Sequence, residues 1–101
     1  MSVRFEQGDL IRIENLRFPL LVVSKNFFNE AEQAICCPVL QDAVPGPLHI
    51  KIHNADVSGT VCCEQLRYFD LRSRGYTRLG SLDLRSVMDI TDAVQSIFDY
   101  Y

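Results

Sequence analysis

Hydrophobic positions divide most of the chain into segments of strand length. Residues 20–24 form a continuous apolar run, which is typical of a buried central strand. Residues 48–53 alternate between apolar and polar, which predicts a half-exposed strand. The full set of predicted strands covers residues 5–13, 20–24, 33–40, 48–53, 60–65 and 77–80. Between them, residues 26–32 are predicted as a loop or one helical turn, and Pro45-Gly46-Pro47 marks a clear loop.

The last segment has a different periodicity. Its apolar residues recur at intervals of three and four and define one helical stripe: Leu84, Val87, Ile90, Val94, Ile97 and Phe98. Ser81 is the predicted N-cap, which places Asp83 in the first turn, where a negative charge interacts favourably with the helix dipole. The pattern therefore predicts a mainly β chain with α: five or six short strands closed by one C-terminal amphipathic helix.

Length and composition narrow the class of protein. A chain of 101 residues that is 48% hydrophobic has the size of one domain, residues 1–101, with enough apolar surface for a core. No apolar run approaches the ~20 residues of a membrane helix, and the start shows no signal-peptide pattern, so we expect a cytoplasmic protein. The net charge of −3 does not indicate nucleic-acid binding by itself. Four clustered arginines nevertheless predict either a locally basic surface or a solvated turn: Arg67, Arg72, Arg74 and Arg78.

The four cysteines occur as two adjacent pairs, Cys36-Cys37 and Cys62-Cys63. Zinc sites usually space their ligands two to four residues apart, so these pairs do not indicate a metal site. Because neighbouring side chains on a strand point to opposite faces, we expect one thiol of each pair in the core and the other facing outward. A disulfide between the two strands is the alternative.

Two segments carry candidate phosphate-binding chemistry. Arg67 and Asp70 are three residues apart, where a predicted strand gives way to a turn. There the guanidinium can bind a phosphate while the carboxylate orients it or transfers a proton; the alternative is a structural ion pair. The alternating strand carries His49, Lys51 and His53 on its polar face, which is either a phosphate-binding face or an ordinary solvated one.

Five segments, taken in order, resemble one protein family. They are Phe5-Glu6-Gln7-Gly8-Asp9-Leu10-Ile11, residues 19–29, residues 48–52, Glu64-Gln65-Leu66-Arg67-Tyr68-Phe69-Asp70 and Arg78-Leu79-Gly80-Ser81-Leu82. Their motifs and order resemble the MazF/PemK toxins of bacterial type II toxin–antitoxin systems, in the superfamily that includes Kid and the CcdB gyrase poisons. The resemblance covers nearly the whole chain.

The resemblance implies an SH3-like small barrel, a homodimer and a cognate antitoxin protein that binds across the active groove. It also implies an endoribonuclease that cleaves single-stranded RNA without a metal or other cofactor. The ribose 2′-hydroxyl would attack the adjacent phosphate and leave a cyclic phosphate and a free 5′-hydroxyl. Such a reaction needs a proton acceptor, a proton donor for the leaving oxygen and a cation at the phosphate.

Residue roles follow from the same resemblance. Arg67 matches the family's recurrent cation, and Asp70 is expected to orient it or a neighbour. Gln65 is expected to hydrogen-bond an RNA base or sugar, because unstacked bases expose their edges. His49 and Lys51 complete the expected RNA-binding face on their strand.

Two positions depart from the family pattern. Phe18 stands directly before the proline of the second strand, where active members carry Arg or Lys, and Leu40 replaces a hydroxyl residue. Arg17 or Lys25 is expected to replace the cation, and Gln41 the hydrogen-bond donor. Losing one such group costs about 10²–10³ in rate. The alternative function is therefore a catalytically silent or protein-targeting, gyrase-poison-like binding module of the same fold.

Overall fold

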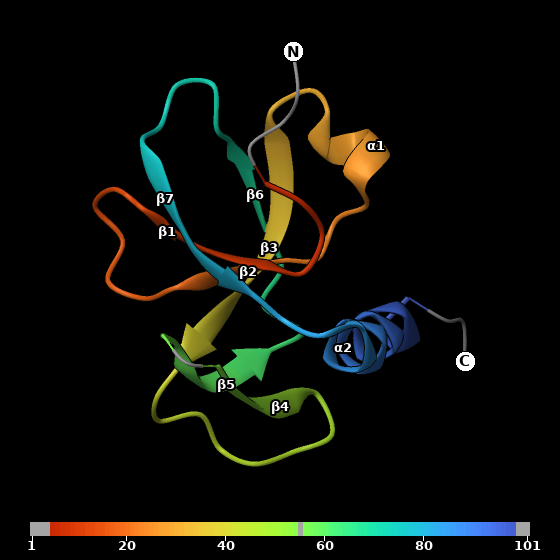
Figure 1. Ribbon diagram of the computed structural model, residues 1–101. Helices are drawn as coiled ribbons and strands as arrows, with labels where there is room; N and C mark the ends of the chain where they lie inside the picture. The colour runs from red at the N-terminus through yellow and green to blue at the C-terminus, as the bar shows by residue number, and fades with distance from the viewer. Residues whose placement is uncertain (1–4, 55, 99–101) are drawn as a thin grey trace.

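The computed structural model describes residues 5–54 and 56–98. The elements in chain order are β1 (Asp9–Ile13), β2 (Leu20–Val22), α1 (Asn26–Asn29), β3 (Gln33–Leu40), β4 (His49–His53), β5 (Ser58–Cys62), β6 (Arg67–Asp70), β7 (Tyr76–Ser81) and α2 (Leu84–Ser96). The strands form one curved antiparallel sheet, and α2 lies beside it (Figure 1). This arrangement agrees with the mainly β pattern and the C-terminal helix that the sequence predicts.

Strand β3 is the centre of the sheet because it pairs along its whole length. One edge pairs with β2, and the other pairs with β6 through residues 33–36 and with β5 through Val39 and Leu40. The continuous strand order is β4-β5-β3-β2-β1-β7, with β6 paired to β3 beside this path. Since the segment Arg67–Asp70 forms a strand where a turn was expected, the sheet of the described residues has seven strands rather than five or six.

The chain enters β1 through a tight turn rather than an extended segment. Gly8 adopts a φ of 94°, and its N–H donates to the Val22 carbonyl at 2.8 Å. The Asp9 carboxylate accepts a hydrogen bond from the Glu6 N–H at 2.9 Å and pairs with Arg78 of β7 at 3.1 Å. The first strand therefore begins at Asp9 and not at residue 5, because the Glu6 and Asp9 N–H groups bond within this turn and the Gln7 N–H bonds to the Asn26 side chain.

Two apolar clusters lie on opposite sides of the curved sheet. The first is built around Phe5, Ile11 and Leu20, and the second is built around Leu10, Leu21 and Ile90 of α2. Neighbouring residues of β1 and β2 thus enter different clusters, as the alternation of a strand requires. Both faces of the central strands are covered.

This double coverage corrects the prediction for the cysteines. All four described thiols are free and buried, with Cys36 in the first cluster and Cys37 in the second. Cys62 and Cys63 are 1% and 0% exposed. The alternation of the strands was anticipated, but the thiols that were expected to face outward are buried, and Cys36 and Cys37 enter two different cores.

Helix α2 differs from its predicted stripe at both ends. Asp83 is the N-cap, and its carboxylate accepts from the Ser86 N–H at 3.2 Å; Ser81 instead ends β7. Only Ile90 of the stripe is fully buried, whereas Leu84 is 75% exposed and Phe98 is 69% exposed. The helix therefore contacts the sheet at its centre. Among the described residues, neither helix has the length and apolar character that a bilayer-spanning segment requires.

Candidate nucleic-acid interface

Two adjoining pockets form one groove at the end of the sheet where β3 stops and β5 starts. The first, of about 380 Å³, includes Arg12, Arg17, Phe18, Leu40, Gln41, Asp56 and Ser58 in its lining. The second, of about 430 Å³, includes Lys51, His53 and Thr60. Gln41 and Ser58 line both pockets, so we treat them as one feature and call it the polar groove.

Antiparallel pairing brings the groove residues together from five parts of the chain: Arg12 and residues 17–19, 39–41, 51–53 and 56–60. The turn between β1 and β2 carries Arg17, and the start of β2 meets the end of β3 through the pair Leu20 and Pro38. The end of β3 in turn meets β5 through the pair Leu40 and Thr60. Strand ends that are far apart in the sequence therefore converge on one side of the sheet.

The wall formed by β3 and β5 is fixed by a close backbone approach. The Gln41 side-chain amide donates to the Ser58 carbonyl at 2.7 Å. Gly59 has a φ of 152°, and a Cβ there would lie 2.9 Å from a Val39 methyl carbon and 3.1 Å from the Gln41 amide nitrogen. A glycine is thus required for Gln41 to reach across to β5.

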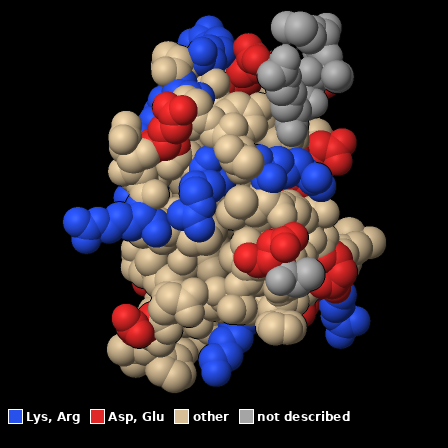
Figure 2. Space-filling model, turned by 60° about the vertical axis from the view of Figure 1, so that its left-hand side comes forward, with Lys and Arg blue, Asp and Glu red and all other residues tan. Residues whose placement is uncertain are grey.

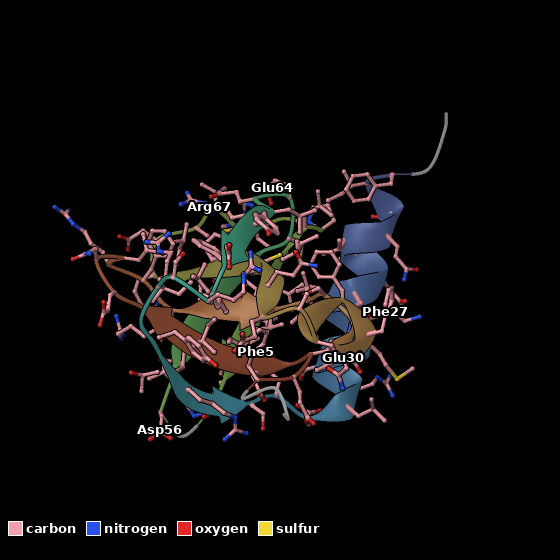
Figure 3. The ribbon with its side chains drawn as sticks, turned by 90° about the horizontal axis from the view of Figure 1, so that it is seen from above. Phe5, Phe27, Glu30, Asp56, Glu64 and Arg67 are labelled. Atoms are coloured by element: carbon pink, nitrogen blue, oxygen red, sulfur yellow. The ribbon has the colours of Figure 1, made fainter. Side chains whose placement is uncertain are left out.

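Arg67 lies at the edge of the groove, over one of its lining side chains. The centre of its guanidinium is 5.3 Å from the centroid of the Phe18 ring, a cation–π contact. Figure 3 shows Arg67 and Glu64 on one side of the molecule and Asp56 well apart from them. Arg67 itself lines neither pocket, so it adjoins the groove through Phe18 and lies apart from Asp56.

Asp70 is not the partner of Arg67. Its two carboxylate oxygens accept from the Arg72 guanidinium at 3.0 and 2.9 Å, which holds the pKa of Asp70 below its usual range. Residues three apart on a strand point to opposite faces, so β6 separates the two side chains. The alternative prediction, that Arg67 and Asp70 form a structural ion pair, is therefore wrong. A catalytic role for Asp70 stays a prediction.

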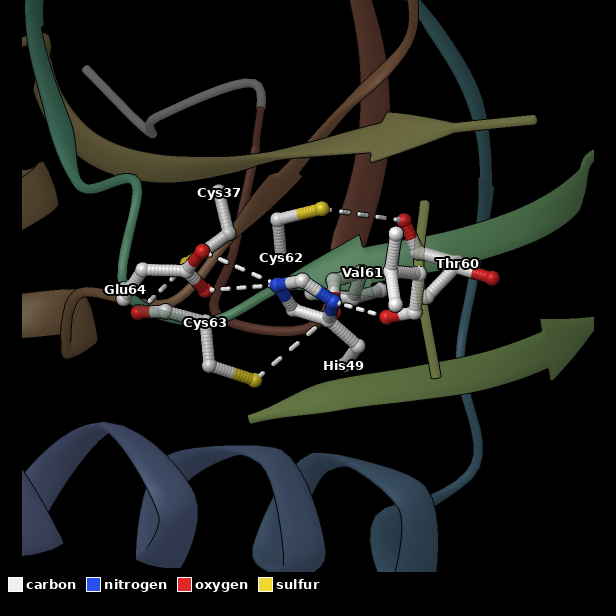
Figure 4. Close-up of polar contacts among 8 residues, drawn as sticks. Cys37, His49, Thr60, Val61, Cys62, Cys63 and Glu64 are labelled. Atoms are coloured by element: carbon white, nitrogen blue, oxygen red, sulfur yellow. Dashed lines mark hydrogen bonds and ion pairs between the residues drawn. The ribbon is translucent and has the colours of Figure 1, made fainter. Parts of the chain in front are cut away.

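His49 belongs to a separate polar cluster, which we call the His49 clasp: His49, Glu64 and the Val44 carbonyl. The His49 Nε2 lies 2.9 and 3.1 Å from the two Glu64 carboxylate oxygens, and Nδ1 contacts the Val44 carbonyl oxygen (Figure 4). Both partners only accept hydrogen bonds, so this geometry favours the imidazolium form. The bond to Glu64, followed by the bond to Val44, raises the pKa of His49, and the His49 bond lowers the pKa of Glu64.

The other predicted RNA-binding residues are divided among different surfaces. Lys51 and Gln41 lie in the polar groove. Lys25 follows β2 and lines a pocket beside α2, whereas Arg17 precedes β2, so the strand separates these two candidate cations. Gln65 is exposed in the turn before β6, outside both pockets of the groove.

Sequence reasoning missed three groove residues: Arg12, Asp56 and Ser58. Arg12 is the exposed residue of an otherwise buried strand, so its charge within an apolar run was an available signal. Ser58 places a hydroxyl-bearing side chain in the groove where Leu40 offers none. For Asp56 we identify no local signal, because its position depends on how the chain returns to β5.

The surface near the β1 and β7 side of the sheet carries charged side chains of both signs. Figure 2 shows Lys and Arg side chains gathered across the middle of this face, with acidic side chains around them. Within the described chain, no group of three or more His, Cys, Asp or Glu residues could hold a metal ion. Burial raises the pKa of Cys36 to about 12 and that of Cys63 to about 11, which keeps these thiols protonated.

Comparison with known proteins identifies close similarity over nearly the whole chain. Residues 8–98 match a family model described as PemK-like, MazF-like toxin of type II toxin-antitoxin system. This match confirms the resemblance that the sequence motifs indicated. A comparison with curated proteins gives no match.

Solved structures show the same fold. A MazE–MazF crystal structure (Form-I) from Deinococcus radiodurans has 26% identity and a TM-score of 0.82, covering 92% of this chain and 94% of that one. The Form-II structure of the same complex has 24% identity and a TM-score of 0.83, covering 96% and 97%. An endoribonuclease in complex with its cognate antitoxin from Mycobacterial species has 16% identity and a TM-score of 0.80, covering 96% and 99%. The predicted fold class, a small β barrel closed by a C-terminal helix, is confirmed.

Proposed function

This chain belongs to the PemK-like, MazF-like toxins of type II toxin–antitoxin systems, and we propose that it cleaves single-stranded RNA as a metal-independent endoribonuclease. The observation that carries this proposal is the polar groove, which combines arginines, an amide, a hydroxyl and a carboxylate. These groups match the needs of phosphodiester cleavage, in which charge develops on the phosphate while protons move. The activity would act on RNA in the cytoplasm.

The proposed reaction is a transesterification within the RNA. A bond forms between the 2′-oxygen and phosphorus, and the bond from phosphorus to the 5′-oxygen breaks. The 2′-hydroxyl gives up its proton and the leaving 5′-oxygen gains one, so the products are a cyclic phosphate and a 5′-hydroxyl. Asp56 is the carboxylate that lines the groove and is the candidate acceptor of the first proton.

Arg17 and Gln41 take the roles that Phe18 and Leu40 cannot fill. Both line the pocket at the end of β3, so a guanidinium and an amide can donate to the same bound phosphodiester. Arg67, over the Phe18 ring, would bind a neighbouring part of the same strand. An RNA strand that crosses the groove would thus contact Arg67, Arg17 and Lys51 in turn.

The proposed partners are a cognate antitoxin, RNA and a second copy of the chain. Two similar structures are complexes with an antitoxin, which supports an antitoxin partner for this protein. Exposed apolar side chains on and just after α2 support further contacts with protein: Leu84, Met88, Ile97 and Phe98. Light scattering of the purified protein tests the homodimer, and co-expression with the neighbouring reading frame tests the antitoxin.

The direct test is cleavage of single-stranded RNA by purified protein in the presence of EDTA. We expect products with cyclic phosphate ends, and no product when the nucleotide before the cut carries a 2′-deoxyribose. Arg67→Ala is expected to lower the rate by about 10²-fold, because it removes a cation near the phosphate. Arg74→Ala is the matched control: Arg74 also lies 5.3 Å from an aromatic ring, but that ring, Phe69, lines neither pocket of the groove, whereas Phe18 lines the first.

Intact RNA at all protein concentrations would refute the nuclease and favour a binding module of the same fold. The presence of Phe18 and Leu40 in the groove is the observation that makes this outcome a specific alternative. Equal losses of cleavage rate in Arg67→Ala and Arg74→Ala would contradict the proposed contact between Arg67 and the bound RNA.

A further inference from the structure

Phe18, the residue before Pro19, is a packing residue. Phe18 is half-buried, packs against the first apolar cluster and carries the Arg67 guanidinium on its ring. Phe18 carries no charge, so it cannot form an ion pair with a ligand in the pocket that it lines. A cation at this end of the groove has to come from another element.

The described arginines divide into three groups by their contacts. Three are paired with carboxylates: Arg72 with Asp70, Arg78 with Asp9 and Arg85 with Asp89. Two lie over aromatic rings: Arg67 over Phe18 and Arg74 over Phe69. Within residues 5–54 and 56–98, Arg12 and Arg17 are the two arginines in neither group, and both line the same pocket. Among the described residues neither of them forms an ion pair, and together they outnumber the single carboxylate of that lining, Asp56.

The backbone of Arg12 is held more firmly than that of Arg17. Arg12 lies in β1 between the buried residues Ile11 and Ile13 and opposite Thr77 of β7. Arg17 lies in the irregular turn before β2. A guanidinium that projects from a paired strand loses less freedom on binding, so Arg12 is the better-positioned of the two.

The charge of the pocket suits a phosphodiester. Two arginines and Asp56 give its described lining a net charge of +1, which a phosphodiester with its single negative charge would balance. Guanidinium groups bind phosphate oxygens through paired N–H donors, which favours Arg over a point charge at this position.

We propose that Arg12 is a phosphate-binding residue of the polar groove, and that with Arg17 it supplies the positive charge that Phe18 does not. This inference rests on the proposed RNA substrate, and it adds a residue that no sequence motif marks. Arg12 donates hydrogen bonds to non-bridging oxygens of a phosphate in the bound strand. It takes no part in proton transfer.

The test is the salt dependence of binding to a short, mixed-sequence 2′-O-methyl RNA, which cannot be cleaved because its 2′-oxygens carry no proton. We expect Arg12→Gln to weaken binding about tenfold at low salt, and to reduce the slope of log K against log [salt] by about 0.7, the value for one phosphate contact of a single strand. Arg12→Lys should keep most of the slope because it keeps the charge. Arg85→Gln on α2 is the matched control, with the same loss of charge at an exposed site outside the groove.

The outcomes separate this inference from the proposed nuclease. If Arg12→Gln binds with the affinity and slope of Arg85→Gln, Arg12 contacts no phosphate and the inference fails, even if the wild-type protein cleaves RNA. If the wild-type protein cleaves nothing but Arg12→Gln alone loses affinity and slope, the nuclease fails and the inference stands. Absence of any RNA binding by the wild-type protein overturns both.

Discussion

The polar groove and the His49 clasp both contain charged side chains but differ in how their charges are compensated. In the clasp, His49 contacts both Glu64 and the Val44 carbonyl, so its charge is neutralised within the fold. In the groove, Arg12 and Arg17 make no described ion pair. A charged residue that the fold leaves without a partner retains its capacity to bind a ligand, and this is why we place the function in the groove.

The largest effect should come from removing a groove cation. Arg17→Gln is expected to lower RNA cleavage by about 10²–10³-fold, because the phosphate loses a donor in the transition state. Arg72→Gln removes the same charge, but Arg72 already forms an exposed ion pair with Asp70. This variant should therefore leave the cleavage rate within about twofold of wild type. Single-turnover cleavage of labelled RNA measures both. Similar rates for the two variants would remove the distinction between compensated and uncompensated arginines.

The next effect concerns the wall of the groove. Gly59→Ala is expected to cost about 1–3 kcal/mol of unfolding free energy, because its φ of 152° is strained for alanine and the new methyl would meet the buried Val39. Urea denaturation measures this change. Gly46→Ala is the control, since a Cβ at Gly46 has no atom within 4 Å, and it should be neutral or stabilise by about 0.4–1 kcal/mol. Equal destabilisation of the two variants would show that the positive φ and the close contacts of Gly59 do not require a glycine.

A smaller effect is expected at the groove hydroxyl. Ser58→Ala should lower cleavage about tenfold without weakening RNA binding by more than about twofold, if Ser58 donates mainly to the developing charge. Ser73→Ala, in the exposed turn between β6 and β7, is the control hydroxyl deletion. Parallel losses of cleavage and binding in Ser58→Ala would instead assign it to ground-state binding.

The smallest effect is a titration shift in the clasp. The folded-state pKa of His49 is raised above its ordinary value of 6.5, so protonated His49 stabilises the fold fully below 6.5 and loses this effect as pH rises through the raised pKa. The pKa of Glu64 is lowered below its ordinary value of 4.5, so its contribution is present above 4.5 and is lost as pH falls through the lowered pKa. The clasp should therefore be most effective between pH 4.5 and pH 6.5.

NMR titration of the His49 ring tests this expectation. Glu64→Gln should lower the pKa of His49 toward its ordinary value, because the largest cause of the shift is the bond to Glu64. Glu30→Gln, which changes an exposed carboxylate outside the clasp, should leave the titration unchanged. An unaltered His49 titration in Glu64→Gln would show that the clasp does not form in solution.

Much of the fold was predictable because its signals are local. Residues 33–40 have the same bounds as β3, and Asn26–Asn29 is the helical turn that residues 26–32 allowed. The N-cap was placed two residues early, at Ser81 instead of Asp83, because both are good N-cap residues and only the pairing of β7 decides where the strand ends.

The candidate site was predictable only in part. Arg17, Gln41 and Lys51 do meet in the groove, but Lys25 and His49 lie elsewhere. The structural pair of Arg67 and Asp70 was wrong, because the segment is a strand with alternating faces and not a turn. Arg12 was missed because a single charge in an apolar strand has many explanations until its neighbours are known.

The sequence by itself determined most of the secondary structure, the family and the set of charged side chains, because periodicity and motif order are properties of neighbouring residues; strand β6 and the exact ends of β1 and α2 were exceptions. Only the tertiary structure decided which of those charges are compensated. Partners such as Glu64 for His49 and Phe18 for Arg67 lie just outside strands, Glu64 after β5 and Phe18 before β2, and long-range sheet pairing brings them together. The same pairing placed Arg12 and Arg17 in the lining of one pocket, where together with Asp56 they give a net charge of +1 that suits a negatively charged ligand.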